Sequence, residues 1–195
     1  MRNLFLVILF ILYSIPSFCQ TSSGTWDDKT ATYTNRAHKL SWKLIEDLKW
    51  DGRPILANST LLKVRNEDTY ILVKLGATYN DGPEQDAWEA MSFYESSEYK
   101  KIIDATAKSE GMKVVESKAI KSQLCGIHAN KLTTHYSKYL SEYQQTIHRV
   151  DYTYQVAVNN YMYTLSVTAL VLTGDELKDF ERVATRIFNG FQISR

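Results

Sequence analysis

The sequence is poor in cysteine, proline and glycine: its 195 residues include 2 cysteines, 3 prolines and 8 glycines. The glycines do not cluster, so no glycine-rich loop of the kind that cradles phosphate groups is present. Neither Gly-x-Ser-x-Gly nor His-Glu-x-x-His occurs, and these are the signatures of common serine hydrolases and zinc proteases. The absences argue against an enzyme of any of these classes.

An excess of charge of one sign is also missing. The chain has 23 Lys and Arg against 22 Asp and Glu, and no block of five or more like charges. Proteins that bind nucleic acids usually show a basic patch or stripe, and acidic tails appear as such blocks. The composition therefore predicts no nucleic-acid partner.

A long apolar run occurs at the N-terminus. Arg2 precedes the unbroken run Leu4–Leu12, and small residues follow at the positions that signal peptidase reads. This pattern predicts a signal peptide over residues 1–19, cleaved before Gln20. The run is too short to span a bilayer comfortably. We expect a secreted or periplasmic protein; the alternative is a lipoprotein anchored through Cys19, and only then is a membrane a partner.

Cleavage before Gln20 leaves Cys125 as the only thiol, which excludes an internal disulfide. We interpret Cys125 as a buried small hydrophobe rather than a nucleophile. Stability must then come from core packing, and the length suits one domain. Residues 20–36, rich in Thr, Ser and Asp, are interpreted as a flexible leader, and residues 37–195 as the folded domain.

The strongest structural pattern lies near the C-terminus. Apolar and polar residues alternate over residues 150–158, and again over residues 161–171. Asn159 and Asn160 separate the two stretches and favour a tight turn. Alternation on both sides of such a turn predicts a β-hairpin.

A helix is predicted after this hairpin. Thr173 and Glu176 have the spacing of a capping box, Gly190 stands where the helix should end, and residues 191–193 form a closing strand. Residues 38–48 fit either a strand or a helix, with a strand preferred. Earlier elements are expected as strands at residues 61–64, 70–77, 112–119 and 126–136, and as helices at residues 87–94 and from residue 97.

These elements predict a single α+β domain with a largely antiparallel sheet, and the residues by themselves indicate helices on one face. The order resembles the PsbP-like superfamily, which includes photosystem II PsbP and a Ran-binding import factor. The resemblance rests on Leu40–Leu44, Trp50, Tyr70–Leu75, Gly126–Tyr136, the hairpin, and Asn189–Ile193. It implies helices packed on the sheet in an α/β/α arrangement, no shared catalytic apparatus, and members that bind other proteins or assist their assembly. This chain would be a bacterial secreted member.

We predict no catalytic, cofactor or metal site. His128 and His135 lie seven residues apart on one expected strand, so their side chains should point to opposite faces. His148 enters the neighbouring strand. The segment Asp81–Asp86 lacks the ladder of a calcium loop and is interpreted as an acidic turn.

Tyrosines are numerous, and many of the 13 lie on or between the last strands. Tyr139 and Tyr143 fall in the expected connection before the hairpin, where exposed tyrosines could anchor a partner; the alternative is an ordinary aromatic-rich sheet edge. The sequence thus predicts a secreted or periplasmic, non-enzymatic protein that binds another envelope or secreted protein or assists its assembly. The alternative function is a module that holds a small apolar or carbohydrate ligand between the sheet and its helices.

Overall fold

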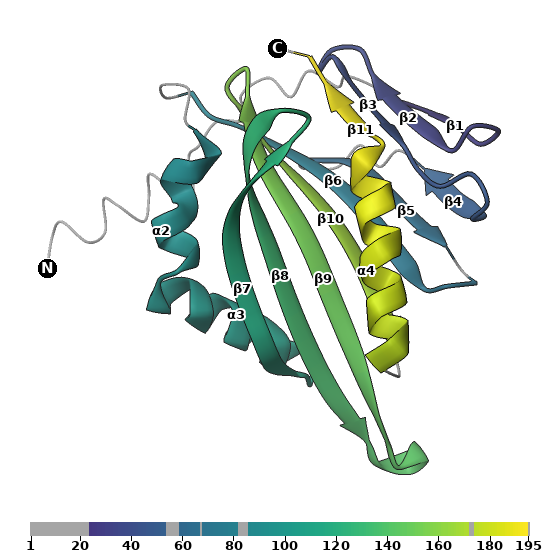
Figure 1. The fold of residues 1–195 in the computed structure, drawn as a ribbon, viewed down its shortest axis with the longest axis vertical. Helices are drawn as coiled ribbons and strands as arrows, with labels where there is room; N and C mark the ends of the chain where they lie inside the picture. Colours follow the sequence, from purple (N-terminus) through teal and green to yellow (C-terminus); the bar gives the residue numbers. More distant parts are fainter. Residues whose placement is uncertain (1–23, 54–58, 67, 82–85, 172–173, 195) are drawn as a thin grey trace, which may run out of the picture.

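A seven-stranded antiparallel sheet forms the body of the protein (Figure 1). The computed structural model describes residues 24–53, 59–66, 68–81, 86–171 and 174–194. The strand order across the sheet is β4-β5-β6-β10-β9-β8-β7. The strands are β4 (Trp50–Arg53), β5 (Thr60–Asn66), β6 (Ile71–Tyr79), β7 (Lys113–Leu124), β8 (Ile127–Leu140), β9 (Gln145–Val158) and β10 (Tyr161–Val171).

β9 and β10 form the hairpin that the sequence predicted, and they lie inside the sheet. Asn159 and Asn160 have positive φ angles of 51° and 62°. A two-residue hairpin turn requires this conformation, and asparagine tolerates it better than most residues. Leu165 and Val167 of β10 are fully buried, whereas their neighbour Ser166 is half-buried. The alternation in the sequence therefore reports which face of each strand points into the core.

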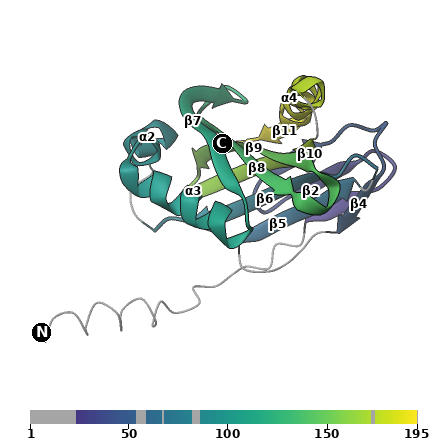
Figure 2. The same cartoon turned by 90° about the horizontal axis from the view of Figure 1, so that it is seen from below.

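Helices cover both faces of the sheet (Figure 2). This confirms the α/β/α arrangement and corrects the expectation of helices on one face. On one face Phe188 packs against Tyr154, with ring centroids 4.7 Å apart. On the other face the Tyr94 hydroxyl donates to the Gln155 side-chain oxygen. The first face carries α4 (Gly174–Asn189), and the second carries η1 (Ala87–Ala90), α2 (Met91–Tyr94) and α3 (Ser97–Ser109).

A second, four-stranded sheet has the order β1-β2-β3-β11. Its strands are β1 (Thr25–Asp27), β2 (Thr32–Asn35), β3 (Leu40–Lys43) and β11 (Phe191–Ile193). The preferred assignment of a strand within residues 38–48 is therefore correct. Trp42 of β3 is fully buried, and its indole N–H donates to the Ile187 carbonyl oxygen of α4 at 2.7 Å. This bond joins the small sheet to the helix.

The expectation of a flexible leader over residues 20–36 differs from the structure, which places β1 and β2 there. Tyr33 is fully buried, and Asn35 is buried beside it and donates its side-chain N–H to the Tyr33 hydroxyl at 3.1 Å. β2 is a strand because it pairs with β3, and this pairing cannot be recognised in a stretch as short as Thr32–Asn35. The predicted signal peptide, residues 1–19, lies outside the described residues.

The first long helix begins as predicted, because the Ser96 side chain caps α3. Spacing predicts an inner face of Tyr99, Ile102, Ile103 and Thr106 for this helix, and the structure buries only one side of that set. Ile103 and Ala107 are buried, whereas Ile102 and Thr106 are exposed. Both pairs have helical spacing, and only the position of the sheet below α3 decides which pair packs against it.

The C-terminal helix ends at the predicted glycine. The Gly190 N–H donates to the Ile187 carbonyl oxygen at 3.2 Å, and β11 follows directly. Thr173 of the predicted capping box lies outside the described residues. Within the part of the chain that the structure describes, no helix is both long enough and apolar enough to cross a membrane.

Candidate functional site

The end of the β8–β9 hairpin extends beyond its neighbours and forms an arm (Figure 1). β7 pairs with β8 only as far as Ser137, and β10 pairs with β9 only as far as His148. Residues 138–147 are therefore flanked by no third strand among the described residues. The turn η2 (Ser141–Tyr143) closes the tip. We call residues 138–147 the β8–β9 arm.

Tyr139 and Tyr143, the two tyrosines that the sequence predicted as partner contacts, lie on this arm. Tyr139 is 62% exposed and Tyr143 is 72% exposed, whereas Tyr33 and Tyr163 are buried in the body. An exposed tyrosine offers a large, flat, amphipathic surface with few rotatable bonds, so little conformational entropy is lost when a partner covers it. The arm thus presents two such side chains away from the core.

A groove of about 580 Å³ lies where the arm leaves the body, between α4 and the turn before β6. We call it the α4 groove. Tyr70 and Leu170 form its exposed apolar rim, and they are 59% and 48% exposed. Other apolar walls come from Ile71, Ile147, Ala169, Phe180 and Val183. The charged residues that line it within the described chain are acidic, namely Asp68, Glu176 and Asp179.

A charged cluster lies on the opposite face of the sheet, and the sequence interpretation missed it. The Arg149 guanidinium pairs with Glu110 at the end of α3 and with Asp151, whose Oδ2 lies 3.2 Å from Nη2. The same guanidinium lies over the Tyr136 ring, 4.1 Å from its centroid. Burial raises the pKa of the Asp151 carboxyl, against the lowering effects of Arg149 and of a hydrogen bond from Thr168.

The signal for this cluster was present in the sequence. Arg149 and Asp151 are opposite charges two residues apart on the strand that the alternation predicts, so their side chains point to the same face. A charge there needs a partner, because an unpaired buried charge is costly. A hollow of about 480 Å³ borders Arg149, and its other charged lining residues are Asp51, Lys63 and Arg65. Tyr70 and Leu170 line this hollow as well, so they form a ridge between it and the α4 groove.

The histidines of β8 and β9 lie at two separate places in the fold. His135 and His148 meet at the base of the arm, with Nε2 of the first 2.8 Å from Nδ1 of the second. His128 lies elsewhere: its ring stacks on Trp88 with centroids 3.5 Å apart, and its Nδ1 is 2.5 Å from Asp86 Oδ2. His128 and His135 thus lie apart, as expected, and His135 and His148 are partly buried.

Of the predicted acidic turn, the structure describes only Asp81 and Asp86. Asp86 caps η1 by accepting the Trp88 N–H at 2.8 Å, and residues 82–85 of the turn lie outside the described part. Among the residues that are described, no three His, Cys, Asp or Glu side chains gather in a way that could hold a metal ion.

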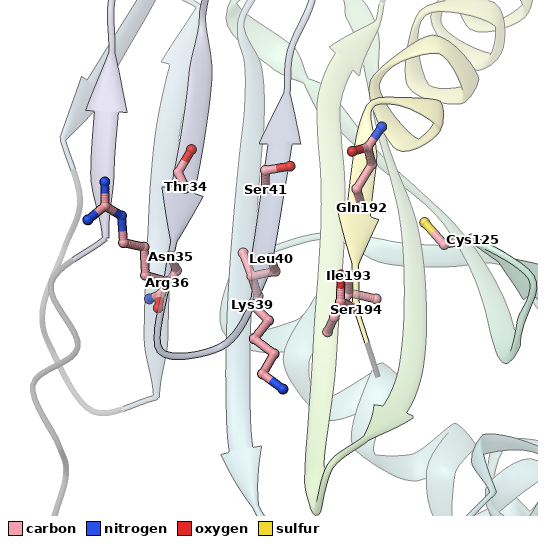
Figure 3. Close-up of a pocket in the computed structure, with 10 residues that line it drawn as sticks. All are labelled: Thr34, Asn35, Arg36, Lys39, Leu40, Ser41, Cys125, Gln192, Ile193 and Ser194. Atoms are coloured by element: carbon pink, nitrogen blue, oxygen red, sulfur yellow. The ribbon is translucent and has the colours of Figure 1, made fainter.

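A third hollow, of about 540 Å³, lies at one end of the small sheet, and its charged lining is Arg36 and Lys39 (Figure 3). Cys125 contributes to it and is exposed, so the prediction of a buried cysteine is wrong. It occupies the β7–β8 turn with a φ of 54°, followed by Gly126 at 73°. The thiol donates to the Phe191 carbonyl oxygen at 2.8 Å, and partial burial raises its pKa. This environment disfavours the reactive thiolate.

No family model matches the sequence, and no curated protein matches it. Solved structures do match. Cyanobacterial PsbP (CyanoP) from Synechocystis sp. PCC 6803 superposes with a TM-score of 0.50 at 8% identity, over 94% of this chain and 99% of that chain.

Two other solved structures are more distant. LpqN of Mycobacterium tuberculosis, which is involved in cell envelope biogenesis, has a TM-score of 0.47 at 14% identity, over 80% of this chain and 83% of its own. The Saccharomyces cerevisiae Ran-binding protein Mog1p has a TM-score of 0.43 at 9% identity, over 87% of this chain and 96% of its own. At such identities a likeness concerns the fold. The near-complete superposition on CyanoP, together with the order of the elements, shows that this chain has the PsbP-like fold.

Proposed function

We propose that this protein is a secreted or periplasmic, non-enzymatic protein that binds another envelope or secreted protein, or assists its assembly, through the β8–β9 arm. The observation that carries the proposal is the exposure of Tyr139 and Tyr143 on a hairpin end that no other strand of the described chain flanks. The shared fold adds little, because one fold serves many functions.

The mechanics of the arm favour a contact role. β8 and β9 continue from the sheet into the arm without interruption, and their register runs from Ala129 opposite Val156 to Leu140 opposite Gln145. A contact surface on such a continuous hairpin is held in place before the partner arrives. This lowers the entropic cost of binding. Tyrosines at the centre of an interface commonly contribute a large share of the binding energy.

The location outside the cytoplasm rests on the N-terminal segment. A positive residue, a short apolar run and small residues before Gln20 have the order that signal peptidase recognises. We propose cleavage near Cys19 and Gln20, with lipidation of Cys19 as the alternative. Mass spectrometry of the exported protein distinguishes the two, because cleavage before Gln20 removes Cys19 whereas lipidation retains it with added acyl chains.

Site-specific photo-cross-linking tests the arm. We would introduce p-benzoyl-phenylalanine at position 139 or 143 and irradiate cells that export the full chain. Position 79 is the matched control, since Tyr79 is also exposed, at 56%, but pairs with Tyr161 at the opposite end of β10. We expect a cross-linked protein from the arm positions and none from position 79. Cross-linking at position 79 alone, or nowhere, would refute the proposal.

Substitution gives a second measurement. Once cross-linking has identified the partner, its binding to the double variant Tyr139→Ser/Tyr143→Ser can be measured by co-purification. Recovery of the partner should fall about tenfold or more, the typical effect of truncating a binding hot spot. The free energy of unfolding of the variant should change by less than about 0.5 kcal/mol per site, as is usual for exposed positions. A variant that binds normally would contradict the proposal, and one that unfolds would show that the tyrosines serve the fold.

The alternative function, a module for a small apolar or carbohydrate ligand, has one specific observation in its favour, the apolar α4 groove. The space between the sheet and α4 is filled by side chains such as Phe180 and Phe188, which are both buried. The α4 groove is the apolar opening beside this packed layer. A ligand of this class should raise the melting temperature of the protein, and Leu170→Ser should abolish the shift.

A further inference from the structure

The arm and the α4 groove form one continuous surface. Ile147 belongs to the arm and also lines the groove. Tyr70 and Leu170 at the groove rim are large apolar side chains that are about half exposed. Exposed apolar surface of this kind, bordered by polar groups, is typical of a site that another molecule covers. A partner that contacts the arm can therefore reach the groove without a change in the fold.

The groove also has a charge of one sign. Asp68, Glu176 and Asp179 line it, and no lysine or arginine does so among the described residues. Asp179 shares an exposed ion pair with Arg182, but Arg182 lies outside the lining. Acidic groups beside apolar walls attract cations more strongly than the same groups surrounded by water. The groove therefore suits a ligand that is apolar at its centre and positive at its ends.

The hollow on the other side of the Tyr70–Leu170 ridge has the opposite character. Lys63, Arg65 and Arg149 line it with Asp51, and because Arg149 is already paired with Glu110 and Asp151, the positive charge at this hollow comes mainly from Lys63 and Arg65. Basic side chains of a ligand are repelled on that side and attracted on the groove side. The ridge thus separates two electrostatic environments and confines a basic segment to the α4 groove.

We propose that the α4 groove binds a segment of the arm's protein partner in which a large apolar side chain is flanked by lysine or arginine residues. The apolar side chain enters between Leu170 and Phe180, and the flanking cations lie near Asp68 and Asp179. This inference rests on the proposed function, because it assigns the segment to the protein that the arm contacts. A second copy of this chain fits less well, since its arm would bring Glu142 toward the acidic groove.

Labelled peptides test the chemistry with the full chain. The probe is fluorescein-Lys-Lys-Leu-Phe-Leu-Lys-Lys, compared with peptides in which Ser or Glu replaces every Lys. Fluorescence anisotropy gives Kd for each. We expect the Lys peptide to bind at least about tenfold more tightly than the Glu peptide, because like charges across an interface are strongly unfavourable. Its affinity should fall as salt rises from about 50 mM to about 300 mM, as screening requires.

Matched variants locate the binding. Leu170→Ser should weaken the Lys peptide about tenfold, because it removes apolar contact area. Ile102→Ser is its control, an exposed apolar residue on α3. Asp68→Asn/Asp179→Asn should weaken the Lys peptide roughly fivefold and remove most of its salt dependence. Asp104→Asn on the exposed face of α3 is the control and should change neither the affinity for the Lys peptide nor its salt dependence.

Four outcomes would overturn the proposal. These are no binding of the Lys peptide, equal binding of the Ser peptide at all salt concentrations (a plain apolar ligand site), tighter binding of the Glu peptide, or a dimer that competes with the peptide. The arm is tested separately: Tyr139→Ser/Tyr143→Ser should leave the peptide Kd unchanged. Cross-linking at positions 139 and 143 without any peptide binding would leave the function of the arm in place and remove only the groove proposal.

Discussion

His135 and His148 face each other across β8 and β9, with Nε2 of His135 2.8 Å from Nδ1 of His148. The two rings lie where the arm leaves the sheet. One ring can donate a proton to the other only while the pair carries at most one positive charge. A second proton removes the hydrogen bond and places two cations in contact, so this contact is sensitive to pH in the range where histidine titrates.

Stability should therefore fall as the pH drops below about 6.5, the pKa of an unfolded histidine. Burial lowers the pKa of His135 in the folded protein, and the neighbouring His148 lowers it further. Burial also lowers the pKa of His38, whose Nδ1 lies 2.9 Å from the Tyr163 hydroxyl. The unfolded chain then binds more protons than the folded one, so stability is present above this range and is lost as the pH falls through it.

Urea denaturation between about pH 7.5 and pH 5 measures this loss, in a window above the usual titration range of carboxylates. The double variant His38→Gln/His135→Gln should show a flatter dependence on pH. A wild-type curve that is flat over the same range would show that neither histidine is coupled to folding.

Trp42→Phe should destabilise the protein by roughly 2 kcal/mol or more, because it removes a buried hydrogen bond and leaves a void. The Trp42 indole N–H donates to the Ile187 carbonyl oxygen, and its ring lies between Phe188 and Phe191. Chemical denaturation measures the change. Trp26→Phe, at a half-exposed position on β1, is the control and should change stability by less than about 0.5 kcal/mol.

Gly190→Ala should cost about 1–3 kcal/mol, the usual penalty of overpacking. A Cβ atom at this position would overlap the backbone carbonyl of Lys43, and the Lys43 N–H donates to the Gly190 carbonyl oxygen at 3.0 Å. The junction of α4, β11 and β3 would have to move apart. Thermal unfolding detects the loss, and Asn189→Ala at the exposed preceding residue provides the comparison. Equal stability of the two variants would show that the junction can adjust.

Arg149→Leu should destabilise the fold by about 3 kcal/mol, because it leaves Asp151 buried without its cation. Adding Asp151→Asn should recover part of this loss, since the buried carboxylate is then gone and the other partner of Arg149, Glu110, is exposed to water. Arg65→Leu, an exposed arginine on the same face, should have little effect. A double-mutant cycle in urea gives the coupling energy, and strictly additive effects of the two substitutions would show that the pair contributes nothing.

The sequence predicted the local elements well because local interactions determine them. Alternation around Asn159-Asn160 predicted the β9–β10 hairpin, and the predicted start of a helix at residue 97 agrees with α3. The order of these elements was enough to indicate the PsbP-like fold. Cys125 shows the limit of such arguments: composition favoured burial, but the turn between β7 and β8 places this residue at the surface.

The sequence by itself determined the long strands of the C-terminal half and the positions of the helices, since turn residues, caps and apolar periodicity act over a few positions. Tertiary structure decided what depends on distant partners. β2 is a strand because β3 lies beside it, and Arg149 is paired because α3 ends over it. The arm exists because β7 and β10 stop pairing before β8 and β9 do. The exposure of Tyr139 and Tyr143 follows from those strand lengths, which no local pattern encodes.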